Sequence, residues 1–466
     1  MTFQNNLLKK NNIILLVILS LGIFYRFYQS NFDDLWLDEF FGFWMSDPKL
    51  DFYETYQRSL GPGWGQNMFF DFVLKYFFYF FGYSPELGRY FISFIGSLNI
   101  ILITYLSYQI DKSRSFILVA FLASHCWHLI SYSQELRGYS FGFFLALLSL
   151  ILFIKILNFS KPKNKIFFGF FYIVVNLCGL INHIFFGLLV FAQSLFLLNF
   201  LEEKEKFKFL LISFLITFLA YLFLMYPFII KNLTNEVFWL QQLSPKFYIE
   251  YFFPRFFGSK IMGYLYLIIF VFLIIYSRNE IFKKKSYFQL LFLIFFVSYL
   301  IPIIYGYIKI PILTDRYIIF VLIPIIILLS SLLFRLKKFK KTLIFVLCVF
   351  TFFNNYLEIF KRENTKPVFK EPLEYINQNS VQDVVVLSQN IDSYIWLKNY
   401  LEKIDHEKFQ SLNFVNKEKT TDKIDFWVIC YHPINSFNCN FFDGESEYKK
   451  MQNYEYYLVD LILYKK

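Results

Sequence analysis

The sequence predicts a multi-pass α-helical membrane protein that carries a small C-terminal α/β domain. Of its 466 residues, 57% are hydrophobic and 17% are charged, whereas soluble domains are usually about 45–50% apolar and about 25% charged. Apolar runs recur from residue 12 to residue 359, with short clusters of Lys and Arg between them. The sequence that follows is more polar and contains strand-like runs. We therefore expect a transmembrane module over residues 1–360 and an α/β domain over 361–466.

The apolar runs predict about eleven transmembrane helices, because a helix needs roughly 20 apolar residues to cross the hydrocarbon of a bilayer. They lie at about 12–28, 88–110, 115–131, 138–157, 166–182, 184–200, 208–230, 261–277, 287–308, 316–334 and 341–359. A further run at 67–82 is short, and Asn67, Asp71 and Lys75 fall on one helical face. That pattern favours a helix lying in the membrane interface.

The positions of the basic residues predict the topology. With about eleven spans, the clusters near residues 9, 112, 163, 206, 283 and 338 fall on one side, as the positive-inside rule requires of cytoplasmic loops. The N-terminus is then cytoplasmic, and the C-terminal domain lies outside the inner (plasma) membrane. The first apolar run resembles a signal peptide but lacks a small-residue cleavage site, so we expect an uncleaved span. Since the sequence offers no continuous basic patch, no nucleic-acid partner is expected.

The tail predicts an α/β domain. Strands are expected at "VQDVVVLS", "DFWVICY" and "YYLVDLILYKK", and a helix at "DSYIWLKNYLEKI" (392–404). Cys430 and Cys439 both lie in this tail. They either form a disulfide in an oxidising compartment or remain two thiols.

The stretch "DDLWLDEFFGFW" (33–44) opens the first outer loop, residues 29–87. We expect Asp33 and Asp34 to be solvated surface charges or helix caps. Asp38 and Glu39 are candidates for a general base, since a carboxylate accepts the proton of an attacking hydroxyl. Later in the loop, "SDP" at 46–48 predicts the start of a second interfacial helix, and "GPGWG" (61–65) separates that helix from the one over 67–82.

Several motifs, taken in order, resemble those of GT-C glycosyltransferases. They are "LWLDEF" after the first span, "FGYSPELGRYFISFIGSL" (81–98), "ISYSQELRGYSFGFFLALLSL" (130–150), "INHIFFGLLVF" (181–191) and "DRYIIFVLIPIIILL" (315–329). The pattern is similar to protein O-mannosyltransferases and lipid A aminoarabinose transferases, and it covers most of residues 12–335. That family tends to have a Pro-Pro motif before the third interfacial helix. Here the place reads "GWGQNMFF", which leaves the acceptor open.

The resemblance implies transfer of a sugar from a polyprenyl-phosphate donor to a hydroxyl on the outer face, with inversion. The donor lipid would be undecaprenyl phosphate in a bacterial host. Asp38 would be the base, and Glu39 would hold the acceptor or the loop helix. Arg137 would bind the leaving phosphate, because a guanidinium is permanently charged and can be bidentate. Alternatively, Arg137 extends to the interface or pairs with Glu135.

The remaining candidates each have a structural alternative. Arg89 and Arg316 lie at outward ends of spans, as ligands or as interfacial anchors. His183 and Tyr139 contact substrate or are packing residues, and the same holds for Tyr132. His125 and His128 are one turn apart near Glu135 but lack an evident third ligand. We therefore expect no metal and no cofactor beyond the lipid-linked sugar.

Two other functions are compatible with the composition. A transporter or lipid flippase usually has ionisable residues near mid-membrane and repeated halves, neither of which this sequence shows. A glycan polymerase or ligase would move whole oligosaccharides instead of one monosaccharide. The acceptor stays open among a protein Ser or Thr, lipid A, a lipopolysaccharide core and another surface glycan.

Overall fold

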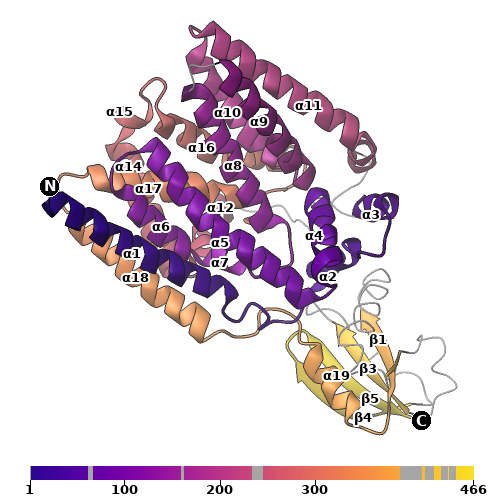
Figure 1. Cartoon of the computed structure of the whole chain (residues 1–466). Coiled ribbons are helices and arrows are strands. Elements are labelled where there is room, and N and C mark those ends of the chain that lie inside the picture. Colours follow the sequence, from indigo (N-terminus) through magenta and orange to yellow (C-terminus); the bar gives the residue numbers. More distant parts are fainter. Residues whose placement is uncertain are drawn as a thin grey trace. The chain divides into compact units, whose positions relative to one another are not determined.

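A computed structural model describes residues 2–60, 67–158, 162–233, 245–388, 412–414, 425–431, 439 and 448–466 (Figure 1). The chain divides into two compact units. The first comprises Met1–Tyr28 and Ser46–Lys361, and the second comprises Gln29–Met45 and Arg362–Lys466. The start of the first outer loop, which the sequence placed with the transmembrane module, thus belongs to the same unit as the tail.

The described part of the first unit is helical. Its longer helices are α1 (Thr2–Phe27), α4 (Met68–Phe81), α5 (Pro85–Ile110), α6 (Ser115–His125), α8 (Tyr139–Asn158), α9 (Pro162–Asn182), α10 (Phe186–Leu197), α11 (Lys204–Leu233), α14 (Lys260–Tyr276), α16 (Tyr287–Ile308), α17 (Leu322–Arg335) and α18 (Lys340–Phe360). Its short helices are α3 (Phe52–Ser59), α7 (Trp127–Ser131), α12 (Pro245–Glu250), α13 (Phe252–Phe257), α15 (Arg278–Ile281), and the 3₁₀ turns η1 (Leu198–Phe200) and η2 (Ile319–Val321).

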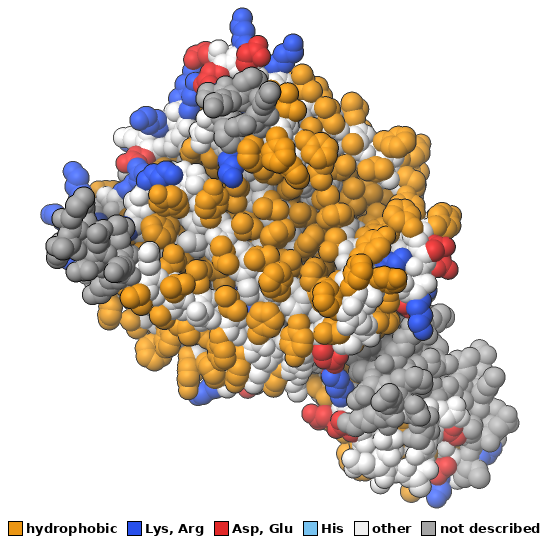
Figure 2. Space-filling model, viewed as in Figure 1, with side chains coloured by type: hydrophobic (Ala, Val, Ile, Leu, Met, Phe, Trp, Pro, Cys, Tyr) orange, Lys and Arg blue, Asp and Glu red, His pale blue; other side chains and the backbone are white. Residues whose placement is uncertain are grey.

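An apolar helix lies in each of the eleven ranges expected to span the membrane. Six of the described helices are long and apolar enough to cross, or up to seven if a bent pair that includes α14 is one span. Four others are apolar but shorter, among them Asn12–Phe27 and Ser115–His125. Hydrophobic side chains cover most of the visible face of this unit (Figure 2), and Phe223 on α11 is 83% exposed. Such a surface suits contact with lipid, while the number of spans stays a prediction.

The expected span over 115–131 is broken. α6 ends at His125, Cys126 is extended with ψ 111°, and α7 starts at Trp127. A helix end leaves carbonyl oxygens without a donor inside the helix. Arg26 supplies donors at this end, with 3.0 Å to the Ala123 oxygen and 3.4 Å to the Ser124 oxygen. The expected range 115–131 therefore contains two helices. The side chain that supplies the donors at the break comes from α1, far away in sequence.

Replacing Arg26 with Met is expected to destabilise the first unit. Arg26 is only 1% exposed, and a hydrogen bond from a charged donor contributes about 1.5–3 kcal/mol. Loss of both bonds to α6 would lower the free energy of unfolding by about 3 kcal/mol. Thermal unfolding of the detergent-purified chain measures this as a lower midpoint. Arg114→Met, at the exposed start of the same helix, should leave the midpoint unchanged, and an equal shift in both variants would contradict the assignment.

The outer-loop helices differ from expectation in start and orientation. α3 begins after Asp51, whose side chain accepts from the Glu54 amide in a capping box, so the helix does not start at 46–48. The polar face of α4 is buried: Asp71 is 2% exposed and Lys75 is 7% exposed. Lys75 Nζ donates to the Asp51 oxygen at 2.9 Å and to Thr55 Oγ1 at 3.0 Å. The polar residues of α4 thus face α3. The "GPGWG" break lies outside the described residues.

The exposed face of α4 is aromatic, which reverses the orientation that the polar spacing suggested. Tyr79 is 68% exposed and Phe80 is 73% exposed. Aromatic side chains of this kind are enriched where a protein meets the membrane interface.

The second unit contains a five-stranded mixed sheet. Its elements are α2 (Leu37–Met45), α19 (Lys370–Asn377), β1 (Asp383–Ser388), β2 (Asn413–Phe414), β3 (Asp425–Tyr431), β4 (Lys449–Tyr456) and β5 (Val459–Lys465). The strand order is β2-β1-β3-β5-β4; β1 is parallel to β2 and β3, and β5 is antiparallel to β3 and β4. Alternating apolar residues such as Phe426, Val428 and Ile462 form the core.

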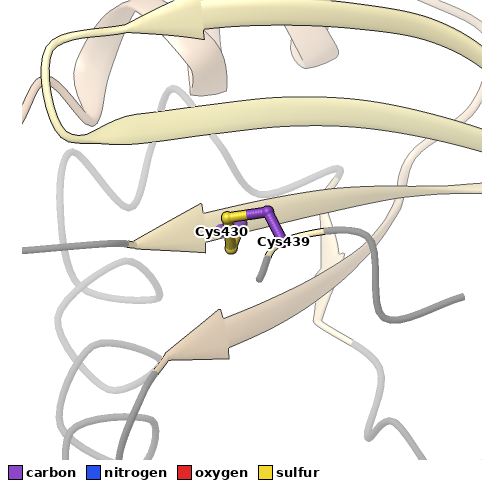
Figure 3. Close-up of a disulfide and its surroundings, with 2 residues drawn as sticks. All are labelled: Cys430 and Cys439. Atoms are coloured by element: carbon purple, nitrogen blue, oxygen red, sulfur yellow. A yellow bond between two sulfur atoms is a disulfide. The ribbon is translucent and has the colours of Figure 1, made fainter. Parts of the chain in front are cut away.

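Two details of the tail depart from the sequence prediction. The last strand was expected over 456–466, but the strand in this range, β5, starts at Val459. Residue 456 is the end of the preceding strand β4, and the two strands form a hairpin whose turn includes Leu458 at φ 57°. The helix expected over 392–404 lies outside the described residues. Cys430 and Cys439 form a disulfide with Cα atoms 5.7 Å apart, which confirms the first of the two alternatives (Figure 3).

Candidate active site

The turn between α7 and α8, residues 132–138, carries the sequence motif with the most candidate residues. Gln134 links this turn to the C-terminal end of α1. Its side-chain amide donates to the backbone oxygens of Tyr25 and Tyr28, both at 2.9 Å. Ser93 of α5 donates to the Ser133 oxygen at 3.0 Å. The Ser and Gln of this motif therefore fix the backbone that presents Glu135 and Arg137.

The other end of the turn is fixed by Gly138. A Cβ atom at this position would lie 2.7 Å from the Asn67 Cβ, so only glycine allows the start of α4 to approach. The Gly138 oxygen accepts from the Asn182 amide at 3.1 Å, which ties the turn to the end of α9.

Two arginines converge on the ring of Tyr139. The Arg137 guanidinium donates to the Tyr139 hydroxyl at 3.3 Å, and its Cζ lies 5.4 Å from the ring centre. The Arg316 Cζ lies 5.9 Å from the same ring. Tyr139 is only 3% exposed, and both guanidinium groups are half-buried. These two permanently charged groups are a candidate binding site for an anion.

His183 completes this group as a neutral side chain. Its ring lies 4.6 Å from the ring of Tyr317. Burial lowers the pKa of His183 to about 3, with the charges of Arg137 and Arg316 acting in the same direction. His183 therefore carries no charge at neutral pH, and it is suited to hydrogen bonding but not to binding phosphate by charge.

These side chains line a small pocket in the first unit. Its walls are formed by Gly138, Tyr139, Gly142, Gly179, Asn182, His183, Phe186, Arg316, Tyr317, Ile319 and Phe320. Three of the predicted site residues therefore share one pocket, and Arg137 contacts one of them. An aromatic pocket with one arginine in its wall suits a phosphate that is joined to an apolar or sugar group.

Two acidic residues near Arg137 have different environments. Asp71 accepts from the Ser59 hydroxyl at 3.3 Å. Burial raises the pKa of Asp71 to about 8, against the opposing charge of Arg137 and the bond from Ser59. Glu135 is buried, at 8% exposed, and its charge and that of Asp315 add to burial in raising the pKa of Tyr132. The sequence pattern placed Asp71 on a polar helical face, but that face was expected to be exposed and is buried.

Asp315 was also missed. It accepts from the Tyr251 hydroxyl at 3.2 Å and lies 3.8 Å from both Arg255 Nε and His128 Nδ1. These contacts hold the segment before Arg316 against α7 and α13. His128 is thus a partner of Asp315, and His125 packs on Phe121 with ring centres 4.2 Å apart. Within the described ranges, no group of three His, Cys, Asp or Glu is placed to hold a metal.

Arg89 is placed apart from the pocket walls. It lies in the second turn of α5 and is 4% exposed. An interfacial anchor would extend its guanidinium to the surface, so this burial does not fit the anchor alternative.

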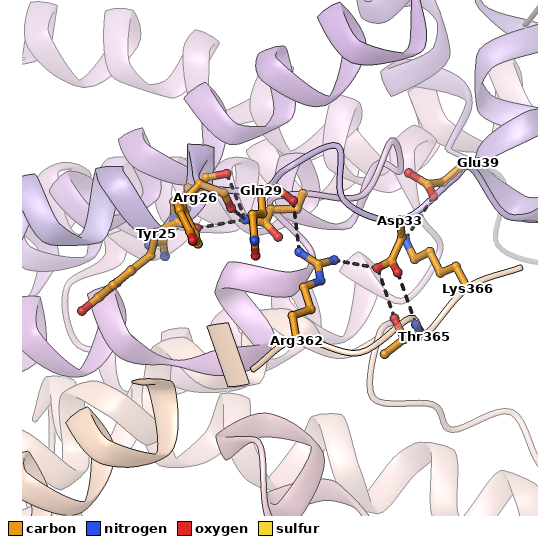
Figure 4. Close-up of polar contacts among 10 residues, drawn as sticks. Tyr25, Arg26, Gln29, Asp33, Glu39, Arg362, Thr365 and Lys366 are labelled. Atoms are coloured by element: carbon orange, nitrogen blue, oxygen red, sulfur yellow. Dashed lines mark hydrogen bonds and ion pairs between the residues drawn. The ribbon is translucent and has the colours of Figure 1, made fainter. Parts of the chain in front are cut away.

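The acidic stretch belongs to the second unit, where its carboxylates bind the tail (Figure 4). Asp33 is 3% exposed and pairs with Arg362 at 2.7 Å. Asp34 accepts from the Phe369 and Lys370 amides at 2.7 and 2.8 Å, at the start of α19. The expectation of solvated surface charges at Asp33 and Asp34 was therefore wrong, because their partners lie more than 300 positions along the chain.

The two remaining carboxylates of this stretch begin α2. Glu39 is fully buried and pairs with Lys366 at 3.0 Å. Asp38 is half-buried, and its charge adds to burial in raising the pKa of Tyr431 to about 12. Asp38 therefore lies near the end of β3, within the second unit.

No family model matches the chain, and no curated protein matches it in sequence. Solved structures do match. ArnT from Cupriavidus metallidurans in the apo state has a TM-score of 0.59 at 10% identity, over 97% of each chain. ArnT bound to undecaprenyl phosphate has a TM-score of 0.56 at 10% identity, over 98% of each. The oligosaccharyltransferase AglB from Archaeoglobus fulgidus has a TM-score of 0.52 at 11% identity, over 90% of this chain and 69% of that one. The chain therefore shares the fold of ArnT and AglB.

Proposed function

We propose that this protein is an integral-membrane glycosyltransferase. It moves a monosaccharide from a polyprenyl-phosphate donor to a hydroxyl on the outer face of the inner membrane, with inversion. The observation that carries this proposal is the approach of Arg137 and Arg316 to the Tyr139 ring, beside a pocket that contains neutral His183. ArnT has a similar fold and has been solved with undecaprenyl phosphate bound, which supports that lipid as the donor carrier.

The proposed reaction is a direct displacement. Asp38 takes the proton of the acceptor hydroxyl, and the hydroxyl oxygen bonds to the anomeric carbon. The bond from that carbon to the phosphate oxygen breaks, and polyprenyl phosphate leaves with the electron pair. The leaving group is already anionic, so it needs a cation beside it, and Arg137 supplies that charge. A direct displacement with inversion needs one base for the acceptor hydroxyl and one cation for the leaving phosphate. The proposed reaction therefore uses no metal or cofactor.

The disulfide supports an extracytoplasmic tail. Disulfides persist in oxidising compartments and are rare in the cytosol, and Cys430 and Cys439 are bonded in the second unit. This agrees with the topology that the basic clusters favour. The acceptor would then be an envelope protein, lipid A or another surface glycan.

The test compares cells that have the gene with cells in which it is deleted. Mass spectrometry of lipid A, surface glycans and envelope proteins should show the loss of one monosaccharide from one class of molecule. Restoring the wild-type protein should restore that mass. A deletion that changes none of these molecules would contradict the transferase assignment.

A second candidate is transfer of an intact oligosaccharide, which the similarity to the oligosaccharyltransferase AglB favours. The same mass spectra separate the two functions. A mass loss equal to several sugars on one acceptor indicates oligosaccharide transfer, and a loss equal to one sugar indicates monosaccharide transfer.

The affinity for undecaprenyl phosphate is expected to fall at alkaline pH because of Asp71. With its pKa raised to about 8, Asp71 is mostly neutral at pH 7 and mostly ionised at pH 9.5. The new charge would compete with phosphate for Arg137 and lower the affinity for undecaprenyl phosphate. Binding by the purified chain in nanodiscs measures this change. Asp71→Asn, which cannot ionise, should bind equally at both pH values, and an equal decline in the variant would exclude Asp71 as the cause.

A further inference from the structure

The acidic stretch of the second unit is fastened on both sides of Asp38. Asp33 and Asp34 precede it, and Glu39 follows it. All three side chains bond to residues 362–370 at the start of the tail; Figure 4 shows the contacts of Asp33 and Glu39. Thr365 adds an amide and a hydroxyl bond to Asp33, at 3.2 and 3.3 Å.

We propose that residues 362–370, here called the clasp, position Asp38 for proton abstraction. This inference rests on the proposed function, in which Asp38 is the base. Lys366 and Arg362 are then positioning residues that act through Glu39 and Asp33. The tail thus takes a direct part in arranging the catalytic loop.

The burial of the two ion pairs makes the arrangement rigid. The Glu39 side chain is 0% exposed and that of Lys366 is 13% exposed; the Asp33 and Arg362 side chains are 2% and 15% exposed. Separating a buried pair leaves an uncompensated charge away from water, which is strongly unfavourable. The loop therefore has one preferred position on the clasp. A catalytic group needs such a fixed position, since a displacement of about 1 Å can reduce a rate about 10²-fold.

Aromatic contacts support the same placement from the sheet. The Phe369 ring lies 5.9 Å from Phe40 of α2 and 5.7 Å from Tyr431 at the end of β3. Burial and the charge of Asp38 keep the Tyr431 phenol protonated, with a pKa of about 12. The protonated Tyr431 hydroxyl thus lies near Asp38. Asp38 itself is half-buried, between Asp34 and Glu39, which are both bonded to the clasp.

Hydrogen exchange on the purified full chain in nanodiscs tests the docking without any substrate. Lys366→Met should leave Glu39 buried without its cation, so that the amides of α2 exchange at least about tenfold faster. Lys449→Met, on the exposed strand β4 of the same unit, is the matched control. Unchanged exchange of α2 in Lys366→Met would overturn the clasp. Thr365→Val, which removes one hydroxyl donor from Asp33, gives a milder test if Lys366→Met does not fold.

Activity and lipid binding then test positioning. Lys366→Met should reduce the sugar added in cells about 30-fold, while undecaprenyl phosphate binding by the purified chain stays within about twofold. Lys366→Arg, which retains the cation, should recover most of the activity. Equal loss of binding and transfer would show a general folding role and overturn positioning, as would unchanged transfer. A wild-type chain that binds no undecaprenyl phosphate and changes no glycan would overturn the proposed function, whereas faster α2 exchange would still support docking.

Discussion

Asp38→Asn is expected to reduce sugar transfer by about 10²–10⁴-fold while leaving the protein folded. This range is the usual contribution of a general base. Asparagine has nearly the size of aspartate but cannot accept the acceptor proton at neutral pH. Asp38 is half-buried and follows two carboxylates that are already fixed to the clasp, so the substitution should not disturb the loop. Quantitative mass spectrometry of the modified glycan, normalised to the amount of protein in the membrane, measures the effect.

Two further variants separate the base from its surroundings. Glu455→Gln removes an exposed carboxylate of β4 in the same unit, outside the clasp, and should transfer sugar normally. Glu39→Gln should destabilise the protein, because it leaves the half-buried Lys366 without its carboxylate. Removing one partner of a buried ion pair lowers the free energy of unfolding by about 3–5 kcal/mol. Its membrane level should fall with its activity. Normal transfer by Asp38→Asn at a normal protein level would place the base at another carboxylate.

The helices of the first unit could be predicted because lipid imposes a simple rule. A spanning segment must satisfy its backbone internally and expose apolar side chains, so an apolar run indicates a helix. The rule fails where a distant side chain satisfies the backbone instead. Arg26 does so at Cys126 and allows the break between α6 and α7. Nothing within 115–131 signals that partner.

The candidate site shows the same division between local and distant information. Arg137, Tyr139, His183 and Arg316 were predicted from local motifs, and the structure brings them together around one pocket. The pairings of the acidic residues could not be predicted. Asp33 meets Arg362, 329 positions later, and a single sequence gives no sign of that contact. Asp71 was visible in the spacing, but the side that α4 presents to α3 depends on tertiary packing.

Arg137→Ala is expected to reduce both transfer and undecaprenyl phosphate binding by about 10³-fold. A charge pair at about 4 Å and an effective dielectric of about 20 contributes about 4 kcal/mol, and each 1.36 kcal/mol is about tenfold. Arg137→Lys should recover part of the loss, because an ammonium supplies the charge without the bidentate geometry. Arg278→Ala, at an exposed arginine of the same unit, is the control for binding and transfer assays.

The competing explanation is that Arg137 acts only through Asp71, whose pKa its charge lowers against burial. The double variant Arg137→Ala with Asp71→Asn distinguishes the two roles. If Arg137 only offsets the charge of the ionised fraction of Asp71, replacing both residues together should restore folding and transfer. If the guanidinium binds the phosphate, the double variant should fold normally but remain about 10³-fold defective. In that variant the Tyr139 hydroxyl would still lack the hydrogen bond from Arg137, and Arg316 would be the remaining arginine beside the phosphate.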